Sequence, residues 1–177
     1  MLAKEILDKN EEIRSDTVLE AVSQIKKQLI SSLKSTNYDY HFYVIKNESV
    51  NAFATLGGHI FIFSGLIEMT DEPEELAAVL AHEIGHVEER HVVNKLVKEI
   101  GVTVLFSILT GSDPVLVGEV AKAAVSSAFD RSQESEADQF ALKTMVETNI
   151  SPRYMARIFR KIKEKYGGYD EHLEFLM

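Results

Sequence analysis

The stretch His82-Glu83-Ile84-Gly85-His86 determines how the whole sequence is interpreted. Two histidines four residues apart lie on one face of a helix, so that both imidazoles can bind a single Zn²⁺ ion. Glu83 follows the first histidine and can act as a general base on water activated by the metal. A chain of this composition, with 6 His among 177 residues, would contain the pattern about 0.02 times by chance. The alternative is a pair of surface histidines that bind nothing.

The residues before the motif predict a helix that carries it. Asp71 and Glu74 have the spacing of a capping box, and Pro73 lies in the first turn, where its missing N–H has no cost. Apolar residues then recur with helical spacing at Leu76, Val79, Leu80, Ile84 and Val87. We therefore predict a zinc-binding helix over residues 71–98.

A catalytic zinc site needs a third protein ligand besides an open position. The chain has no cysteine, so this ligand must be His, Asp or Glu. Glu89 and Val92 stand where a metzincin has Gly and His, which excludes that pattern. His91 lies about 140° round a continuous helix from His86, so we expect a surface or core histidine there rather than a ligand.

An acidic segment later in the chain offers the missing ligand. Glu134 and Asp138 are four residues apart and share a helix face, whereas Glu136 points about 200° away from Glu134. A ligand glutamate followed one turn later by an aspartate suits a metal site, because the aspartate can accept the free ring N–H of a ligating histidine. The alternative is a solvated acidic helix face.

These residues together resemble the HtpX-like zinc metallopeptidases, the gluzincin group that includes the CAAX prenyl protease. The resemblance rests on Asn51-Ala52-Phe53-Ala54 through Ile67, on the motif at residues 82–86, and on residues 131–138. It implies that Glu134 is the third ligand, beside His82 and His86, and that Asp138 is the partner of a ligating histidine. It also implies one Zn²⁺ per chain and that the strand Asn51, Ala52, Phe53, Ala54 lines the cleft, where an extended peptide can add to the sheet.

The implied activity is that of a zinc metalloendopeptidase in protein quality control, with Glu83 as general base and a protein or peptide as substrate. The alternative is a zinc-containing, chaperone-like or protein-binding module with little activity. Membrane members of the family carry transmembrane helices, whereas this chain has no run of about 18 apolar residues. It therefore resembles the soluble members of the bacterial cell envelope or periplasm, and the sequence alone leaves a cytoplasmic location open.

Family members also carry a His-Pro followed by an Arg in a later segment. His172 is followed by Leu, so that role is not transferred to it, and we expect the segment to follow residue 177. Tyr166, Tyr169 and His59 are candidates for stabilising an oxyanion, although each also fits a structural role. Residues 1–5 contain no apolar segment, so we expect no signal peptide here.

The rest of the pattern predicts a single α+β domain over residues 1–177. We expect it to be mainly helical, with a small sheet of about three strands over the zinc-binding helix. The expected order is N-terminal helices at 1–35, the sheet at 40–64, the zinc-binding helix at 71–98, an apolar helical hairpin at 101–129, the third-ligand helix at 131–148 and C-terminal helices at 151–177.

Charge and hydropathy narrow the possible partners. The net charge of −9 argues against nucleic acid, which needs a basic face. The segment 102–109 has no charge on any side, so a helix there is not amphipathic. We expect part of residues 101–129 to stay exposed near the cleft and to mediate self-association, partner docking or contact with a membrane surface. The alternative is a hairpin that packs entirely on the domain.

Overall fold

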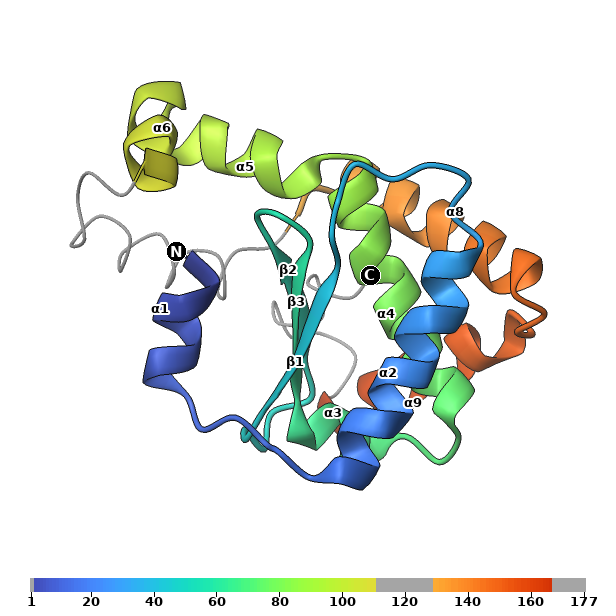
Figure 1. Ribbon diagram of the computed structural model, residues 1–177. Coiled ribbons are helices and arrows are strands. Elements are labelled where there is room, and N and C mark those ends of the chain that lie inside the picture. Colours follow the sequence, from blue (N-terminus) through green and yellow to red (C-terminus); the bar gives the residue numbers. More distant parts are fainter. Residues whose placement is uncertain (1, 111–128, 167–177) are drawn as a thin grey trace.

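The computed structural model describes residues 2–110 and 129–166 (Figure 1). It confirms the prediction of a mainly helical α+β fold with a three-stranded sheet. The elements are α1 (Leu2–Lys9), α2 (Asp16–Ser31), β1 (His41–Ile45), β2 (Ala52–Thr55), β3 (His59–Phe63), α3 (Ser64–Met69), α4 (Pro73–Glu88), α5 (His91–Ile100), α6 (Val102–Thr110), α8 (Arg131–Glu147) and α9 (Arg153–Tyr166).

The sheet has the order β1-β3-β2, with β1 parallel and β2 antiparallel to the central strand β3. The strand β2 therefore forms one edge. Gly57 and Gly58 connect β2 to β3, and both have φ of +83°, a conformation that other residues rarely adopt. The Gly-Gly pair thus permits the tight turn that brings Phe53 opposite Phe61.

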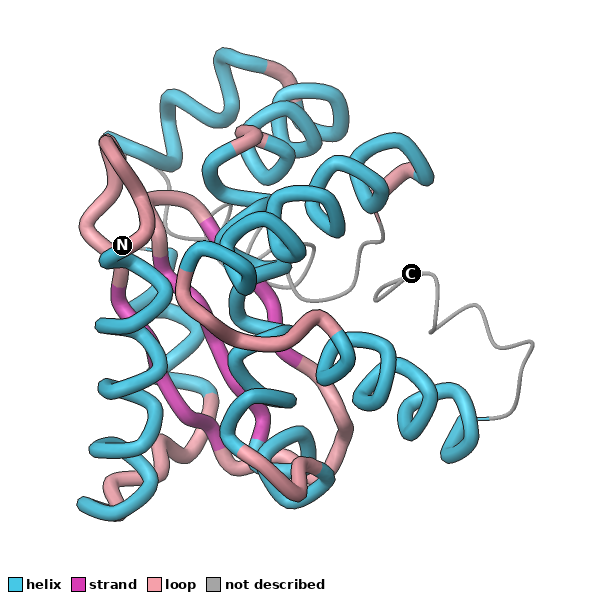
Figure 2. Tube along the Cα trace, turned by 90° about the vertical axis from the view of Figure 1, so that its right-hand side faces the viewer, coloured by secondary structure: helices cyan, strands magenta, loops and turns pink. Residues whose placement is uncertain are grey.

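Helices cover both faces of the sheet, with α1 on one face and α2 and α4 on the other (Figures 1 and 2). Every residue of β2 is buried, and so is every residue of β3 except His59. Strands that are covered on both faces read as continuous apolar runs rather than as an alternation. This explains why His59-Ile60-Phe61-Ile62-Phe63 is apolar throughout its second to fifth positions.

The helix α4 lies at the centre of the molecule, and every residue from Glu75 to Val87 is buried. It contacts α2, β2, α8 and α9, so no side of it faces solvent over that stretch. A Cβ atom at Gly85 would lie 3.1 Å from both the Cα and the carbonyl oxygen of Ala137. Glycine at this position therefore allows α4 and α8 to cross closely.

The predicted helix over 71–98 is wrong in its extent, because the structure divides this stretch into α4 and α5. The N–H of Arg90 bonds to the carbonyl of Val87, and Arg90 has a left-handed φ of 59°. The chain changes direction there, and α5 begins at His91. No Gly or Pro marks the break, so the sequence pattern gave no sign of it.

Pro73 lies in the first turn of α4, as predicted. Asp71, however, is not the N-cap residue of this helix. The N–H of Asp71 donates to Glu75 at 2.8 Å, not to Glu74. Glu75 also forms ion pairs with Arg157 (2.8 Å) and Lys161 (2.7 Å) of α9. The first turn of α4 is thereby held by α9.

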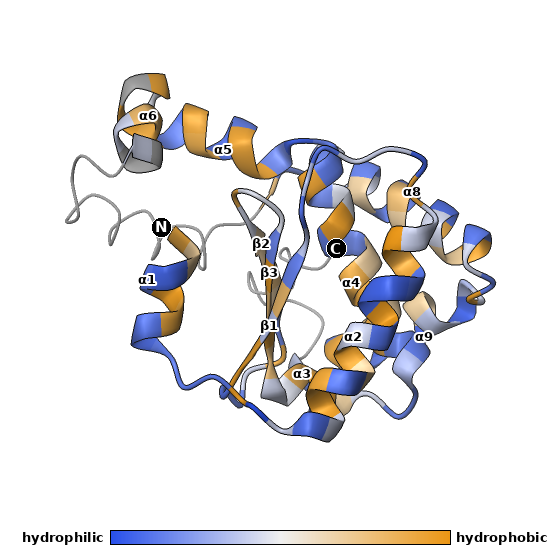
Figure 3. Cartoon of the chain, in the orientation of Figure 1, coloured by the Kyte–Doolittle hydropathy of each residue, from blue (hydrophilic) through white to orange (hydrophobic). Residues whose placement is uncertain are grey.

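The predicted hairpin at 101–129 is described only in part. Its first segment forms α6, after a bend at Gly101 with φ of +79°. Leu105 is buried, whereas the side chains of Val102 and Phe106 face solvent. Part of α6 is coloured as hydrophobic in Figure 3. The turn at 111–114 and the expected helix from 115 lie outside the described residues, apart from Phe129. Within residues 2–110 and 129–166, no helix is long and apolar enough to cross a membrane.

Candidate metal centre

His82 and His86 lie one turn apart on α4, and their Nε2 atoms are 3.0 Å from each other. Glu134 of α8 completes the group, with Oε2 at 3.2 Å from Nε2 of His82 and Oε1 at 3.7 Å from Nε2 of His86. One ligand atom from each residue lies within 4.8 Å of the other two, and all three residues are buried. The structure thus brings the three predicted ligands together from two helices.

The geometry and chemistry of this group suit a metal ion. Both carboxylate oxygens of Glu134 are buried, and their contacts with the histidine Nε2 atoms do not have hydrogen-bond geometry, which is costly unless a cation binds them. Nitrogen and oxygen ligands placed tetrahedrally around zinc lie about 3.3–3.5 Å apart. The distances in the group lie within a few tenths of an ångström of that spacing.

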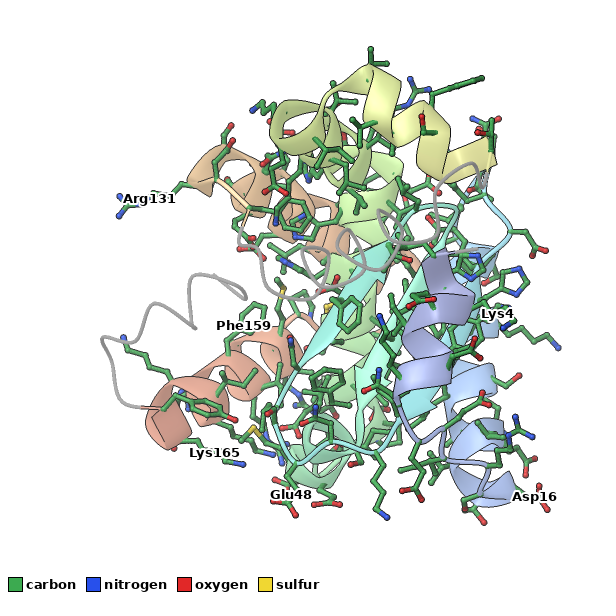
Figure 4. All side chains as sticks on the ribbon, turned by 90° about the vertical axis from the view of Figure 1, so that its left-hand side faces the viewer. Lys4, Asp16, Glu48, Arg131, Phe159 and Lys165 are labelled. Atoms are coloured by element: carbon green, nitrogen blue, oxygen red, sulfur yellow. The ribbon has the colours of Figure 1, made fainter. Side chains whose placement is uncertain are left out.

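The position of Glu134 follows from the start of α8. Asp130 caps this helix by accepting from the backbone N–H groups of Ser132 and Gln133, and Gln133 completes the capping box. Glu134 lies one turn later, on the side that faces α4, whereas Arg131 points away from the body (Figure 4). The close crossing of the two helices then brings the Glu134 carboxylate to the histidines.

Asp138 lies one turn after Glu134, and its Oδ1 is 2.8 Å from Nδ1 of His82. This is the nitrogen on the opposite side of the ring from the Nε2 that faces Glu134. A hydrogen bond from Nδ1–H to this carboxylate leaves the lone pair of Nε2 free for a metal. The structure therefore brings Asp138 within hydrogen-bonding distance of the outer ring nitrogen of His82.

The two histidines differ in pKa because their electrostatic environments differ. Burial lowers the pKa of His86 to about 4. Burial also opposes a charge on His82, but its contacts with Asp138 and Glu134 outweigh this and raise its pKa to about 10. Burial likewise opposes ionisation of Glu134, yet the two histidines lower its pKa. Metal ligands must be deprotonated, so a metal can bind at this group only when the Nε2 atom of His82 carries no proton.

Glu83 points from α4 to the edge of the sheet, where its Oε2 accepts the backbone N–H of Ala54 at 2.9 Å. Burial raises the pKa of Glu83 to about 8, and repulsion from Glu134 adds to this, whereas His82 and the Ala54 N–H act in the opposite direction. A buried carboxylate with a pKa near neutral pH is well matched to exchange a proton during catalysis.

The predicted substrate strand lies directly beside Glu83. Asn51 accepts from Phe63 of β3 through its backbone carbonyl, so this residue and Phe53 face β3. The alternation of a strand then turns the backbone groups of Ala52 and Ala54 outward. The edge of β2 thus carries outward-facing backbone groups beside Glu83, on two residues that are themselves buried.

Two of the three candidates for stabilising an oxyanion, Tyr166 and His59, make their hydrogen-bonding contacts elsewhere. The Tyr166 hydroxyl accepts the backbone N–H of Val50 at 3.1 Å. His59 lies 3.1 Å from the Tyr43 hydroxyl, and both residues line a cavity of about 640 Å³ between α1 and the sheet. Tyr169 and His172 lie outside the described residues.

Sequence reasoning missed three residues near the ligands. Nδ1 of His91 lies 3.0 Å from Nδ1 of His86, and Nε2 of His91 lies 3.0 Å from a carboxylate oxygen of Glu136. The ring of Phe129 stacks on His86 with centroids 3.9 Å apart. The expectation that His91 and Glu136 point away from the site assumed a continuous helix for His91, and the break at Arg90 removes that assumption.

Comparison with known proteins agrees with this geometry. The model of peptidase family M48 matches residues 18–176. The chain is 31% identical over 169 residues to a beta-barrel assembly-enhancing protease of Yersinia pestis, covering 88% of this chain and 35% of that protein. It is 26% identical to metalloprotease YcaL of Escherichia coli, covering 85% of this chain and 63% of the relative. It is 27% identical to mitochondrial metalloendopeptidase OMA1 of Schizosaccharomyces pombe, covering 87% of this chain and 47% of that protein. The chain thus spans about a third of the first of these relatives.

Proposed function

The chain belongs to peptidase family M48, and from this premise we propose that it carries the catalytic centre of a zinc-dependent metalloendopeptidase. The observation that supports the proposal is the convergence of His82, His86 and Glu134 within 4.8 Å, with Glu83 on the same helix. Two imidazoles and one carboxylate leave a position open, as a catalytic zinc site requires. A purely structural zinc site has no use for a buried base beside it.

In this proposal the chain's own residues perform the following steps. His82, His86 and Glu134 would hold one zinc ion, which when bound would supply Lewis-acid chemistry to a water molecule and to the scissile carbonyl. Glu83 accepts a proton at its carboxylate and delivers it to the leaving amine. The Ala54 N–H orients that carboxylate, and Asp138 orients the His82 ring.

The substrate in this proposal is an extended peptide segment of a protein. Ala52 and Ala54 turn backbone groups outward at the edge of β2 but are 0% and 6% exposed, so a peptide that adds there as a further strand must displace what covers this edge. Asn51 and Phe53 hold β2 against β3 from the other side. A backbone-based contact of this kind suits a protease that acts in protein quality control on unfolded segments.

The proposed cellular location of the protein rests on its relatives in sequence. We propose that the protein acts in the bacterial cell envelope or periplasm, as a relative of the soluble HtpX-like members, because relatives at 26–31% identity include proteases named for enhancing β-barrel assembly. We also propose that the exposed side chains of α6, Val102 and Phe106, take part in self-association, partner docking or contact with a membrane surface.

The test compares zinc content and casein cleavage of the wild type with those of Glu83→Gln. We expect zinc to remain bound in the variant, while cleavage falls by at least about 100-fold, because the loss of a general base removes 10²–10⁴-fold of the rate. Glu89→Gln is the matched control, since it makes the same change at an exposed position just after α4. A wild type that binds zinc but cleaves nothing would favour a chaperone-like or protein-binding module instead.

A further inference from the structure

The environment of the second histidine ligand differs from that of the first. His82 contacts a carboxylate directly, through Asp138 at 2.8 Å. His86 instead contacts another histidine, because its Nδ1 lies 3.0 Å from Nδ1 of His91. His91 in turn lies 3.0 Å from Glu136 through its Nε2. On its Nδ1 side, the ring of His86 is therefore connected to α8 through an intermediate side chain.

The protons along this chain of contacts can be assigned from chemistry. When the Nε2 lone pair of His86 binds a metal, the only proton of the neutral ring lies on Nδ1, so Nδ1–H donates to His91. Nδ1 of His91 must then accept, which places the proton of His91 on Nε2. That N–H faces the Glu136 carboxylate, which accepts it. Each contact in the chain thus has one donor and one acceptor.

The surroundings hold His91 in this position. Its side chain is only 3% exposed, whereas that of Glu136 is 53% exposed. The left-handed conformation of Arg90 starts α5 in a new direction and turns His91 back toward His86. A left-handed conformation is uncommon for a residue other than glycine, and here it gives a buried polar side chain a partner on each ring nitrogen.

We propose that His91 is a positioning residue for the metal centre, which fixes the tautomer and ring orientation of His86, and that Glu136 in turn fixes the tautomer of His91. This inference rests on the proposed metal-binding role of His82, His86 and Glu134. It assigns the alternate acidic residues of α8 three different tasks: Glu134 contacts the metal, Asp138 orients His82, and Glu136 orients His86 through His91.

The test measures zinc affinity by competition with a chromogenic chelator, together with the visible absorption spectrum of the Co²⁺-substituted protein. His91→Phe keeps the ring volume but removes the acceptor, so zinc affinity should fall ~10–100-fold and the Co²⁺ spectrum should change. His91→Asn retains an acceptor near the position of Nδ1 and should recover most of the affinity. Far-ultraviolet circular dichroism checks that each variant folds.

Glu136→Gln tests the second contact, with Glu147→Gln as the matched control at an exposed position of the same helix. Glu136→Gln should weaken zinc binding several-fold in the wild-type background and should have no further effect in His91→Phe, because the two residues act in one chain. Wild-type affinity and spectrum in His91→Phe, or additive effects of the two substitutions, would overturn the proposal. If His91→Phe does not fold, the comparison of His91→Asn with Glu136→Gln decides in the same way. A wild type that binds no zinc would instead overturn the proposed function.

Discussion

At the scale of single residues, the centre depends on which atom of each side chain faces the group. Both histidines turn Nε2 toward Glu134 and use Nδ1 for a protein partner. This division is what allows a neutral imidazole to bind a cation, since one nitrogen keeps the proton and the other keeps the lone pair. The carboxylate of Glu83 stays outside the ligand set because the Ala54 N–H holds it at the sheet edge.

Replacement of Asp138 tests whether a protein partner at Nδ1 of His82 supports metal binding at its Nε2. Asp138→Ala removes the acceptor of the Nδ1 proton, so we expect metal affinity or activity to fall ~10–100-fold with the fold intact. The measurement is zinc affinity alongside thermal unfolding of the chelator-treated protein. Glu147→Ala serves as control on the same helix. A normally metallated, fully active Asp138→Ala would show that Asp138 is only a surface carboxylate.

At the scale of elements, α4 depends on its neighbours more than on its own amphipathic pattern. It is buried on all sides between Glu75 and Val87, and α8 approaches it closely at Gly85 and Ala137. Its first turn is held by α9, through the ion pairs of Glu75 with Arg157 and Lys161. The ligands therefore belong to a helix whose position is fixed at its start and along its length.

Replacement of Glu75 tests the contact between α4 and α9. Glu75→Gln keeps the shape of the buried side chain but removes the charge that Arg157 and Lys161 pair with. We expect the free energy of unfolding to fall by about 2 kcal/mol, the range for hydrogen bonds to charged groups. Urea unfolding of Glu74→Gln, in the same turn, is the control and should be close to the wild type. Equal stability of Glu75→Gln and wild type would show that α9 contributes little to holding α4.

The helix α6 has a buried side and an exposed side, and one substitution on each side tests their different roles. Leu105 is 6% exposed and Phe106 is 67% exposed. Leu105→Ser should destabilise the fold by about 2 kcal/mol or more, as for other losses of buried apolar side chains. Phe106→Ser should change stability by less than about 0.5 kcal/mol, but should reduce self-association or liposome binding, measured by ultracentrifugation and vesicle flotation. A wild type that shows neither property would contradict a docking role for this helix.

At the scale of the whole molecule, the proposed zinc ion joins α4 to α8, so metal binding and folding are linked. Zinc at about 1,000 times its dissociation constant would stabilise the fold by ~4 kcal/mol, which corresponds to roughly 8–16 °C in melting temperature for a chain of this size. Calorimetry after removal of metal by a chelator should show this decrease, and added Zn²⁺ should reverse it, whereas Mg²⁺ should not. A melting temperature that does not respond to the chelator would contradict a stabilising ion at this centre.

The sequence predicted the parts of the site that depend on local spacing. The pairs His82 and His86, and Glu134 and Asp138, were predicted because residues four apart share a helix face. His91 could not be predicted, since its position depends on a left-handed residue, Arg90, that carries no Gly or Pro signal. For the fold, strand positions were predicted from apolar runs and glycines, but the order β1-β3-β2 depends on long-range pairing that local pattern does not specify.

The hydrogen bond between Ala54 and Glu83 has a consequence for specificity. Of the outward-facing backbone groups on β2, one N–H is already used by the catalytic carboxylate, so an incoming chain meets the N–H and C=O of Ala52 and the C=O of Ala54. These groups do not depend on the substrate's side chains. Under the proposed function, the position of the cut would then depend on the substrate's backbone amides relative to these hydrogen bonds, and substrates of very different sequence would be accepted. When proline is placed at successive positions of a peptide substrate, cleavage should fall at two positions that are two residues apart, because their N–H groups would donate to the carbonyls of Ala52 and Ala54.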